Sequence, residues 1–335
     1  MSESNIEITE LYKQDFNEYD FSKLILQIKG PLINNFVVNC LRRIAFKNIP
    51  TYAICEESIT IEFNDSIFNN DYMRLRLAQL PLFNINNEID FLQRKYWHEI
   101  DYSDNKREKN PNDDKHIELY LSSHNDTASN INVFSNSIKF YEDGNKINDP
   151  LKQIAPVLIV QLRPNQTFKM KARAVLGVGE RNDIWSSVST MFYEEIKKDE
   201  FKVTVESQGQ FNEYVILMKC CRIAKKKLDD IKKLVEENFK YHNVKKGELI
   251  EIVLTNEDHT IGNIINNGLQ SHPNIDYSGL LKPDLLIEEI IIKLVSQSDL
   301  PLKPFFDVIK NNINTFDIIE KQLQKVGKKY LKDFK

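Results

Sequence analysis

The stretch NCLRRIAFKNIPTYAI, residues 39–54, joins a predicted helix to a predicted strand. The helix starts upstream, because Gly30-Pro31 breaks a strand at 24–28 and a proline is well placed to open a helix. Pro50 ends the helical segment, and residues 51–63 are rich in β-branched side chains, which predicts a strand. The apolar residues of the helix recur at spacings of three and four and form one stripe: Ile33, Val37, Cys40, Leu41 and Ile44.

A later stretch repeats this order of elements. A strand at 250–254 precedes a helix that runs through Asn263, and Pro273 and further strands follow. A supersecondary unit present twice suggests a pseudo-symmetric pair whose apolar stripes bury against each other about a local two-fold axis. Chance similarity is the alternative. Each copy is later followed by a long amphipathic helix: 211–241 and 304–331.

The two copies differ on their first helices. The first copy carries Arg42 and Arg43, whereas the second carries IINN at residues 264–267. A pair with two arginines on one half only can present one asymmetric face, which suits a heteromeric partner. The alternative is that both arginines are ordinary exposed residues of a helix.

A β-rich stretch with polar loops separates the two parts of the first unit. A short helix at 70–79 precedes it, and residues 101–114 and 122–130 are expected to be loops. The expected strands are 117–121, 137–141, and a strand pair, 156–162 with 168–176, joined by 163–166.

The long helix at 211–241 follows a strand at 201–206 and carries many lysines. They fall mostly off the apolar face, so we expect a solvated face, and an anionic partner is the alternative. These residues are Lys225, Lys226, Lys227, Lys232 and Lys233.

Composition and charge exclude several classes of protein. The chain has 335 residues, of which 41% are hydrophobic, and this is enough for two or three domains with cores. The net charge of −4 argues against a protein that grips DNA by itself. Neither a run of about 18 apolar residues nor the apolar core of a secretion signal is present, so we expect a protein that works inside a cell, without a membrane.

The sequence contains no recognisable catalytic or metal-binding constellation. The four cysteines, Cys40, Cys55, Cys220 and Cys221, lack the C-x-x-C spacing of zinc sites, so we expect reduced structural thiols, no metal and no cofactor. Gly177-Val178-Gly179 resembles half of a nucleotide loop but lacks the Gly-Lys-Ser/Thr of a phosphate loop. Catalysis by this chain is not expected, and a nucleotide-binding enzyme stays as a rival hypothesis.

Several motifs resemble one family. Residues 39–54 resemble the signature of the alpha-like, D-type subunits of RNA polymerases, which include bacterial alpha and the third-largest subunit of eukaryotic RNA polymerase II. Other segments of the chain resemble further sequence elements of the D-type subunits, and these segments are 74–82, 161–166, 172–179, Trp185 and 201–209. Three later segments resemble the L-type subunit, which is the small partner of the D-type: 256–263, 272–274 and 278–279. A D–L fusion resembles the arrangement in some large nucleocytoplasmic DNA viruses, which suggests a viral source.

The resemblance implies a fold and a division into domains. The fold is α+β, with two related dimerisation modules paired as an intramolecular pseudo-dimer and a β-rich insertion domain. The implied domains are a discontinuous D-like module at 1–82 and 169–243, the insertion at 83–168, and an L-like module at 244–335.

The resemblance also implies a function, which is a non-catalytic platform on which the two large catalytic subunits of a DNA-directed RNA polymerase assemble for transcription. The partners are beta-like and beta-prime-like subunits and small accessory subunits, and DNA is reached only through the complex. The expected location is the host cytoplasm (a viral factory) or the nucleus, with packaging in the virion left open. A free-standing scaffold or regulatory pseudo-dimer unrelated to transcription is the rival.

Particular residues follow from the resemblance. Arg42 and Arg43 are expected to contact the beta-like subunit. Asp258 can cap a helix that begins near Thr260. Residues expected to serve module pairing or structure are Asn39, Leu41, Pro50, Asp258, His259, Thr260, Gly262 and Asn263.

The sequence departs from the family pattern at two places. Many D-type subunits carry cysteines for zinc or an iron–sulfur cluster in the insertion, and residues 82–168 contain none. Residues 180–185, ERNDIW, also differ from the usual His-Ala-Lys-Trp-like string, which puts the partner contacts of this segment in doubt.

Overall fold

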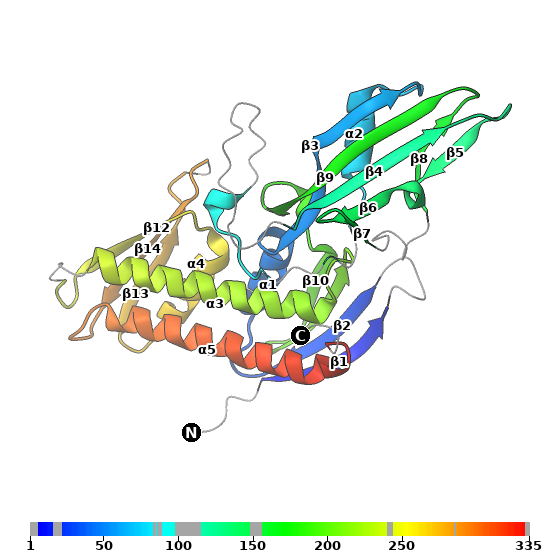
Figure 1. Ribbon diagram of the computed structural model, residues 1–335. Helices are drawn as coiled ribbons and strands as arrows, with labels where there is room; N and C mark the ends of the chain where they lie inside the picture. Colours follow the sequence, from blue (N-terminus) through cyan, green and yellow to red (C-terminus); the bar gives the residue numbers. More distant parts are fainter. Residues whose placement is uncertain are drawn as a thin grey trace.

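The computed structural model describes residues 6–15, 22–82, 85, 89–97, 115–147, 156–239, 244–284 and 286–331. Within these ranges the chain is a mixed α+β protein with several antiparallel sheets (Figure 1). The predicted α+β class is therefore confirmed. The loop expected at 101–114 lies outside the described residues.

The first sheet has the strand order β1-β2-β11-β10, and its neighbouring strands are antiparallel. Alternate residues of β2 are buried, as expected for a strand with one face on a core, and the buried residues are Leu24, Leu26 and Ile28. Helices α1 and α3 pack on this sheet and on each other. The bounds are β1 (Glu7–Gln14), β2 (Lys23–Lys29), β10 (Val188–Lys197), β11 (Glu200–Ser207), α1 (Asn35–Lys47) and α3 (Glu213–Asn238).

Helix α1 begins at Asn35, so the predicted start at Pro31 is wrong. Asn34 is the N-cap, and its side-chain oxygen accepts a hydrogen bond from the backbone N–H of Val37 at 3.0 Å. Pro31 lies in a tight turn, in which the N–H of Ile33 donates to the carbonyl of Gly30 at 2.9 Å. An asparagine at the N-cap satisfies a helix donor that would otherwise lack a partner, and proline has no side-chain acceptor for it.

The second sheet has the order β12-β14-β13 and is also antiparallel. Its strand β12 leads into α4 through an N-cap at Asp258, as the sequence predicted. Helix α5 follows β14 and ends in a short 3-10 turn, η4. The bounds are β12 (Leu249–Thr255), β13 (Ile275–Leu281), β14 (Glu289–Ser296), α4 (His259–Gln270), α5 (Lys303–Val326) and η4 (Gly327–Lys329).

A third, five-stranded sheet, β3-β9-β4-β6-β7, extends away from the first two (Figure 1). It shares a separate apolar core with α2 and with the two-stranded sheet β5-β8. The strands are β3 (Pro50–Asn64), β4 (Ile117–His124), β5 (Ile131–Phe134), β6 (Lys139–Glu142), β7 (Asn145–Lys146), β8 (Leu158–Leu162) and β9 (Thr167–Val178). The helices are α2 (Asn70–Ala78) and the 3-10 turns η1 (Arg94–Tyr96), η2 (Ser135–Ser137) and η3 (Asp183–Trp185).

Strands β8 and β9 do not pair with each other, so the predicted strand pair is wrong. They follow one another in sequence, but β8 pairs with β5 and β9 pairs with β3 and β4. The buried Asn125 holds the point where they diverge, because its amide donates to the carbonyl of Leu162 at 2.9 Å and its backbone carbonyl accepts from Asn165 at 2.8 Å. The turn was predictable, but the sheet to which each strand belongs depends on distant partners.

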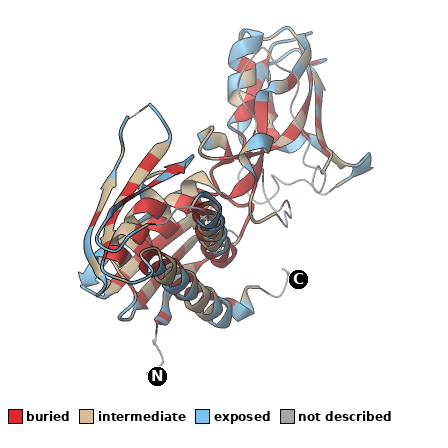
Figure 2. Ribbon diagram, turned by 90° about the vertical axis from the view of Figure 1, so that its left-hand side faces the viewer, coloured by how far each residue is buried: buried red, intermediate tan, exposed pale blue. Residues whose placement is uncertain are grey.

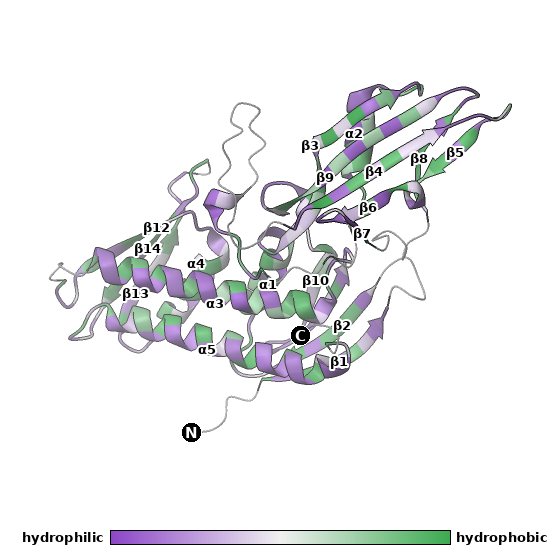
Figure 3. Cartoon of the chain, viewed as in Figure 1, coloured by the Kyte–Doolittle hydropathy of each residue, from purple (hydrophilic) through white to green (hydrophobic). Residues whose placement is uncertain are grey.

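The first two sheets and their helices share one apolar core. Helices α3 and α5 lie along one another across both sheets, and α1 packs against α4 (Figure 1). The buried residues of these elements gather between the layers (Figure 2), and α3 and α5 each have an apolar and a polar side (Figure 3). One core therefore joins residues from the N-terminal and C-terminal parts of the chain. None of the described helices combines the length and apolar character needed to cross a membrane.

Candidate functional site

The signature stretch, residues 39–54, forms most of α1 and the start of β3. Leu41 is buried in the shared core and Pro50 is buried at the first position of β3. Asn39 lies one helical turn before Arg42, and its side-chain oxygen accepts hydrogen bonds from Nε and Nη2 of Arg42 at 3.0 and 2.9 Å. The amide thereby fixes the guanidinium of Arg42 on the partly exposed side of α1.

Arg43 points instead to the N-terminus of α4. Its Nη2 lies 2.6 Å from Oδ2 of Asp258, and Nζ of Lys47 lies 3.6 Å from the same oxygen. The other oxygen of Asp258 accepts from the backbone N–H of Thr260 at 2.7 Å. The structure thus joins two residues that the sequence singled out separately, one from each half of the chain.

The environment of Asp258 favours its charged form. Burial works against ionisation, but the hydrogen bond from Thr260 and the charges of Arg43 and Lys47 outweigh it and lower the pKa of Asp258 to about 2. A carboxylate at a helix N-terminus is also stabilised by the helix dipole. Asp258 is therefore both the cap of α4 and the anion that holds two cations of α1.

A second ion pair lies beside the first. Nζ of Lys227 on α3 lies 3.1 Å from both carboxylate oxygens of Glu257. Burial raises the pKa of Glu257, and the nearby ammonium only partly offsets this. The two pairs border a small cavity of about 30 Å³ at the junction of α1, α3 and α4, whose lining also includes Asn48 and Glu180.

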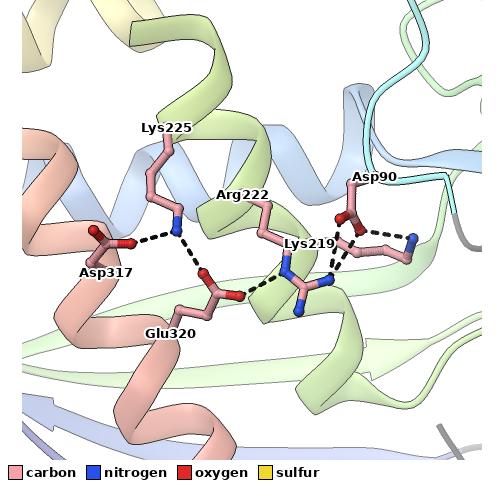
Figure 4. Close-up of polar contacts among 6 residues, drawn as sticks. All are labelled: Asp90, Lys219, Arg222, Lys225, Asp317 and Glu320. Carbon is pink, nitrogen blue, oxygen red and sulfur yellow. Dashed lines mark hydrogen bonds and ion pairs between the residues drawn. The ribbon is translucent and has the colours of Figure 1, made fainter. Parts of the chain in front are cut away.

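Helices α3 and α5 are joined by a network of charges (Figure 4). Lys225 lies 2.5 Å from Asp317 and 2.8 Å from Glu320, and Nε of Arg222 lies 2.6 Å from the other oxygen of Glu320. Arg222 also contacts Asp90 at 3.2 Å. The almost fully buried Lys219 contacts Asp90 as well, at 3.2 Å, so the segment before η1 is held by the same network.

The expectation of a uniformly solvated lysine face on α3 is therefore wrong in part. Lys225 and Lys227 form ion pairs with the second half of the chain. The other three lysines pair within α3 at a spacing of four residues, as on an ordinary exposed helix surface. Sequence periodicity places a residue on a side of the helix but does not show which partner that side meets.

The far end of α5 returns to the first sheet. Tyr330 stacks on Tyr214 with ring centroids 5.6 Å apart, and Lys13 of β1 forms a buried ion pair with Glu213 at 2.6 Å. A Cβ at Gly327 would lie 2.7 Å from the ring of Tyr214, so only glycine permits this close approach. No sequence motif had indicated this contact.

The remaining predicted residues of α4 lie around its first turns. His259 is exposed, and Asn263 is partly buried. Gly262 is buried, and a Cβ there would lie 2.6 Å from Cδ1 of Ile290 and 3.0 Å from a methyl of Leu280. Gly262 thus lets α4 lie close to its own sheet.

The glycines at 177 and 179 have a packing role. A Cβ on Gly177 would lie 2.4 Å from the indole of Trp185, and one on Gly179 would lie 1.9 Å from the carbonyl oxygen of Phe46. Trp185 is fully buried, and its indole N–H donates to the carbonyl of Val175 at 2.9 Å. These close approaches explain the Gly-x-Gly spacing without a bound phosphate.

The four cysteines are buried free thiols, and burial raises the pKa of each. Within the described ranges, no group of three or more histidine, cysteine, aspartate or glutamate residues is placed to hold a metal ion.

Comparisons with known proteins point to transcription. Residues 33–228 match the family model described as the RNA polymerase Rpb3/Rpb11 dimerisation domain. The chain is 28% identical over 310 residues to R470 of Acanthamoeba polyphaga mimivirus, a protein named for a DNA directed RNA polymerase subunit, with 86% of each chain covered. It is 26% identical over 312 residues to RPAC1 of Mus musculus, a subunit of DNA-directed RNA polymerases I and III, with 84% of this chain and 80% of that protein covered.

Proposed function

The chain belongs to the family of the RNA polymerase Rpb3/Rpb11 dimerisation domain, and on that basis we propose that it is a non-catalytic assembly subunit of a multisubunit DNA-directed RNA polymerase. Its relatives from a virus and from mammals carry the names of subunits of such polymerases. Its role is to bring the large catalytic subunits together for transcription.

The proposal includes a pseudo-dimer within one chain. Its D-like module is 1–82 with 169–243, and its L-like module is 244–335. The insertion is 83–168, and its apolar core extends into β3, α2 and β9 of the flanking D-like segments. The observation that carries this is the shared core, in which α1 packs on α4 and α3 packs on α5. The ion pair between Arg43 and Asp258 supports it, because it joins corresponding helices of the two modules.

The proposed contact with the beta-like subunit centres on Arg42 and Arg43. Arg42 supports it best, because its guanidinium is held by Asn39 at the partly exposed surface of α1. Arg43 is engaged with Asp258, so its contribution is to fix the module that presents Arg42. The beta-prime-like subunit and small accessory subunits complete the proposed set of partners.

The experiment is purification of the tagged chain from cells that produce the whole complex, followed by mass spectrometry. Two large polymerase subunits should co-purify. Arg42→Glu should reduce recovery of the beta-like subunit by about tenfold or more, because a reversed charge at a desolvated contact costs over about 1.4 kcal/mol. The control is Lys226→Glu, which changes an exposed cation on α3. Purification without any polymerase subunit would support a free-standing scaffold instead.

A further inference from the structure

The outer face of the second sheet, β12-β14-β13, carries two rows of apolar side chains. Helix α4 packs on the other side of this sheet, and α5 packs on α4 (Figure 1). The strand register places the side chains of each row side by side. The rows are Leu249, Val295 and Tyr277, and then Val253, Ile291 and Leu281.

A single polar row separates the two apolar rows. It consists of Glu251 and Lys293, which form an ion pair at 2.7 Å, beside Gly279. Four of the six apolar side chains belong to the exposed large apolar residues of the protein: Leu249, Val253, Tyr277 and Leu281. Leu286, in the turn before β14, is 92% exposed.

The corresponding face of the first sheet is different. Its rows carry ion pairs between neighbouring strands, at 3.0 Å for Lys29 with Glu7 and 3.1 Å for Lys23 with Glu206. A third pair, Lys202 with Glu194, lies at 3.3 Å. One row holds apolar residues, Tyr12, Ile25 and Phe192. The outer faces of the two sheets thus differ in chemistry, because three ion pairs between strands lie on the first sheet and one, Glu251 with Lys293, lies on the second.

The size of the apolar face indicates what kind of partner covers it. Three strands about 4.8 Å apart and two to three rows about 7 Å apart give roughly 300 Å². A stable homodimer buries about 800 Å² on each partner, so this face alone does not hold two copies of the chain together. It is large enough for one part of a wider contact with a subunit that is also held elsewhere.

We propose that the outer face of β12-β14-β13 is a docking surface for another subunit of the polymerase complex. That subunit presents apolar or aromatic side chains to both rows and a polar group to the Glu251–Lys293 pair. This inference rests on the proposed function and adds a second contact surface, on the module opposite to Arg42. The asymmetry between the two sheets then allows one pseudo-symmetric protein to bind two different partners.

Cysteine labelling tests the proposal with little disturbance of the fold. Val253 and Phe192 are matched positions, since they are 42% and 43% exposed on the outer faces of the two sheets. The four native thiols are buried, so a maleimide should report on an introduced Val253→Cys or Phe192→Cys. In the free chain both should label. In the assembled complex labelling of Val253→Cys should slow at least tenfold, and labelling of Phe192→Cys should not change.

A charge substitution provides the second measurement. Val253→Glu should lose a polymerase subunit on purification, whereas Phe192→Glu should keep the full set. The proposal is overturned if the subunits co-purify but Val253→Cys labels equally in the free and assembled states. It is also overturned if the isolated chain self-associates and this protects Val253→Cys, because the occupant is then a second copy. If the wild-type chain brings down no polymerase subunit, the proposed function fails, and this inference fails with it.

Discussion

Arg43 and Asp258 illustrate what individual residues contribute to this protein. They lie 215 positions apart in the chain and meet at 2.6 Å. The sequence identified each from a local pattern, because an arginine pair on a helix and an N-cap aspartate are local features. It assigned Arg43 to an external partner, since nothing local shows which surface a helix meets. The contact gives both residues a shared role at the junction of α1 and α4.

The lowered pKa of Asp258 predicts how stability depends on pH. The pKa falls from an ordinary 3.8 to about 2 on folding, so the stabilisation is present above pH 3.8 and is lost as the pH falls toward 2. The full shift corresponds to at most about 2 kcal/mol, and partial exposure reduces this to roughly 1 kcal/mol. Urea unfolding of wild type and Asp258→Asn should therefore differ most at pH 5 to 7, differ by about half as much near pH 3, and converge only at about pH 2 and below. A difference that stays constant over this range would contradict the linkage, and Asp71→Asn, at an exposed ion pair, provides the control.

The close packing around Gly179 predicts that adding one methyl group there lowers the stability of the fold. A Cβ there would lie 1.9 Å from the carbonyl oxygen of Phe46, so the end of α1 and the end of β9 must separate. Gly179→Ala should lower the free energy of unfolding by about 1–3 kcal/mol or more, which is the usual cost of overpacking in a well-packed site. Chemical denaturation followed by the fluorescence of the buried Trp185 measures this. Ser189→Ala, on an exposed strand position, should change stability by less than about 0.5 kcal/mol.

At the scale of elements, the charges between α3 and α5 predict unequal costs for two similar substitutions. Glu320 bridges Lys225 and Arg222, so Glu320→Ala leaves the partly buried Lys225 and the exposed Arg222 without this partner and should cost about 1–3 kcal/mol. Glu236 lies 3.8 Å from Lys232 on the exposed side of α3, and Glu236→Ala should cost less than about 0.5 kcal/mol. Thermal or urea unfolding of the two variants gives the comparison, and equal losses would show that the network adds nothing to the packing of the helices.

Elements whose limits depend on local chemistry were predicted well from the sequence. Strand β2 was expected at 24–28 and spans 23–29, and α2 was expected at 70–79 and spans 70–78. Their apolar periodicity and flanking residues define them without reference to distant partners. The pairing of β8 with β5, and of β9 with β3, was not predictable, because each depends on strands far away in sequence.

The same limit applies to the candidate site. The capping role of Asp258 was predicted because the acceptor and the Thr260 N–H lie two residues apart. The pairing of Lys227 with Glu257 was not predicted, although the sequence had placed Lys227 on the long helix and Glu257 just before the start of α4. It depends on how α3 crosses the start of α4, and that crossing is set by the packing of the whole core.

At the scale of the whole molecule, contacts between the two halves are spread along the long helices. Arg43 meets Asp258 beside Lys227 of α3, and Tyr330 stacks on Tyr214 at the start of α3. The shared apolar core also includes Phe305, Ile309 and Phe316 of α5, all fully buried. A half of the chain taken alone would expose this surface to water, at a cost of about 25 cal/mol for each Å².

The apolar core shared by the two halves predicts how the chain behaves when it is cut between them. The cut between Lys246 and Gly247 falls in the turn before β12, where the N–H of Gly247 donates to Ser296 at 2.9 Å. The fragments 1–246 and 247–335, expressed together, should co-elute at about 1 μM, because the apolar interface replaces the covalent link. Each fragment alone should aggregate or stay partly unfolded. Separately folded fragments without mutual affinity would contradict the pseudo-dimer.

Two neighbouring positions on α5 make this experiment specific to the interface. Ile309 is buried in the shared core and Lys310 is exposed. Ile309→Asp places a charge among apolar side chains, so the ion must be desolvated without a partner and the fragments should no longer co-elute. Lys310→Asp changes the charge by two units at the adjacent residue and should leave co-elution intact. Loss of binding by both variants would point to unfolding of α5, whereas loss by Ile309→Asp alone places the association in the buried face that the two modules share.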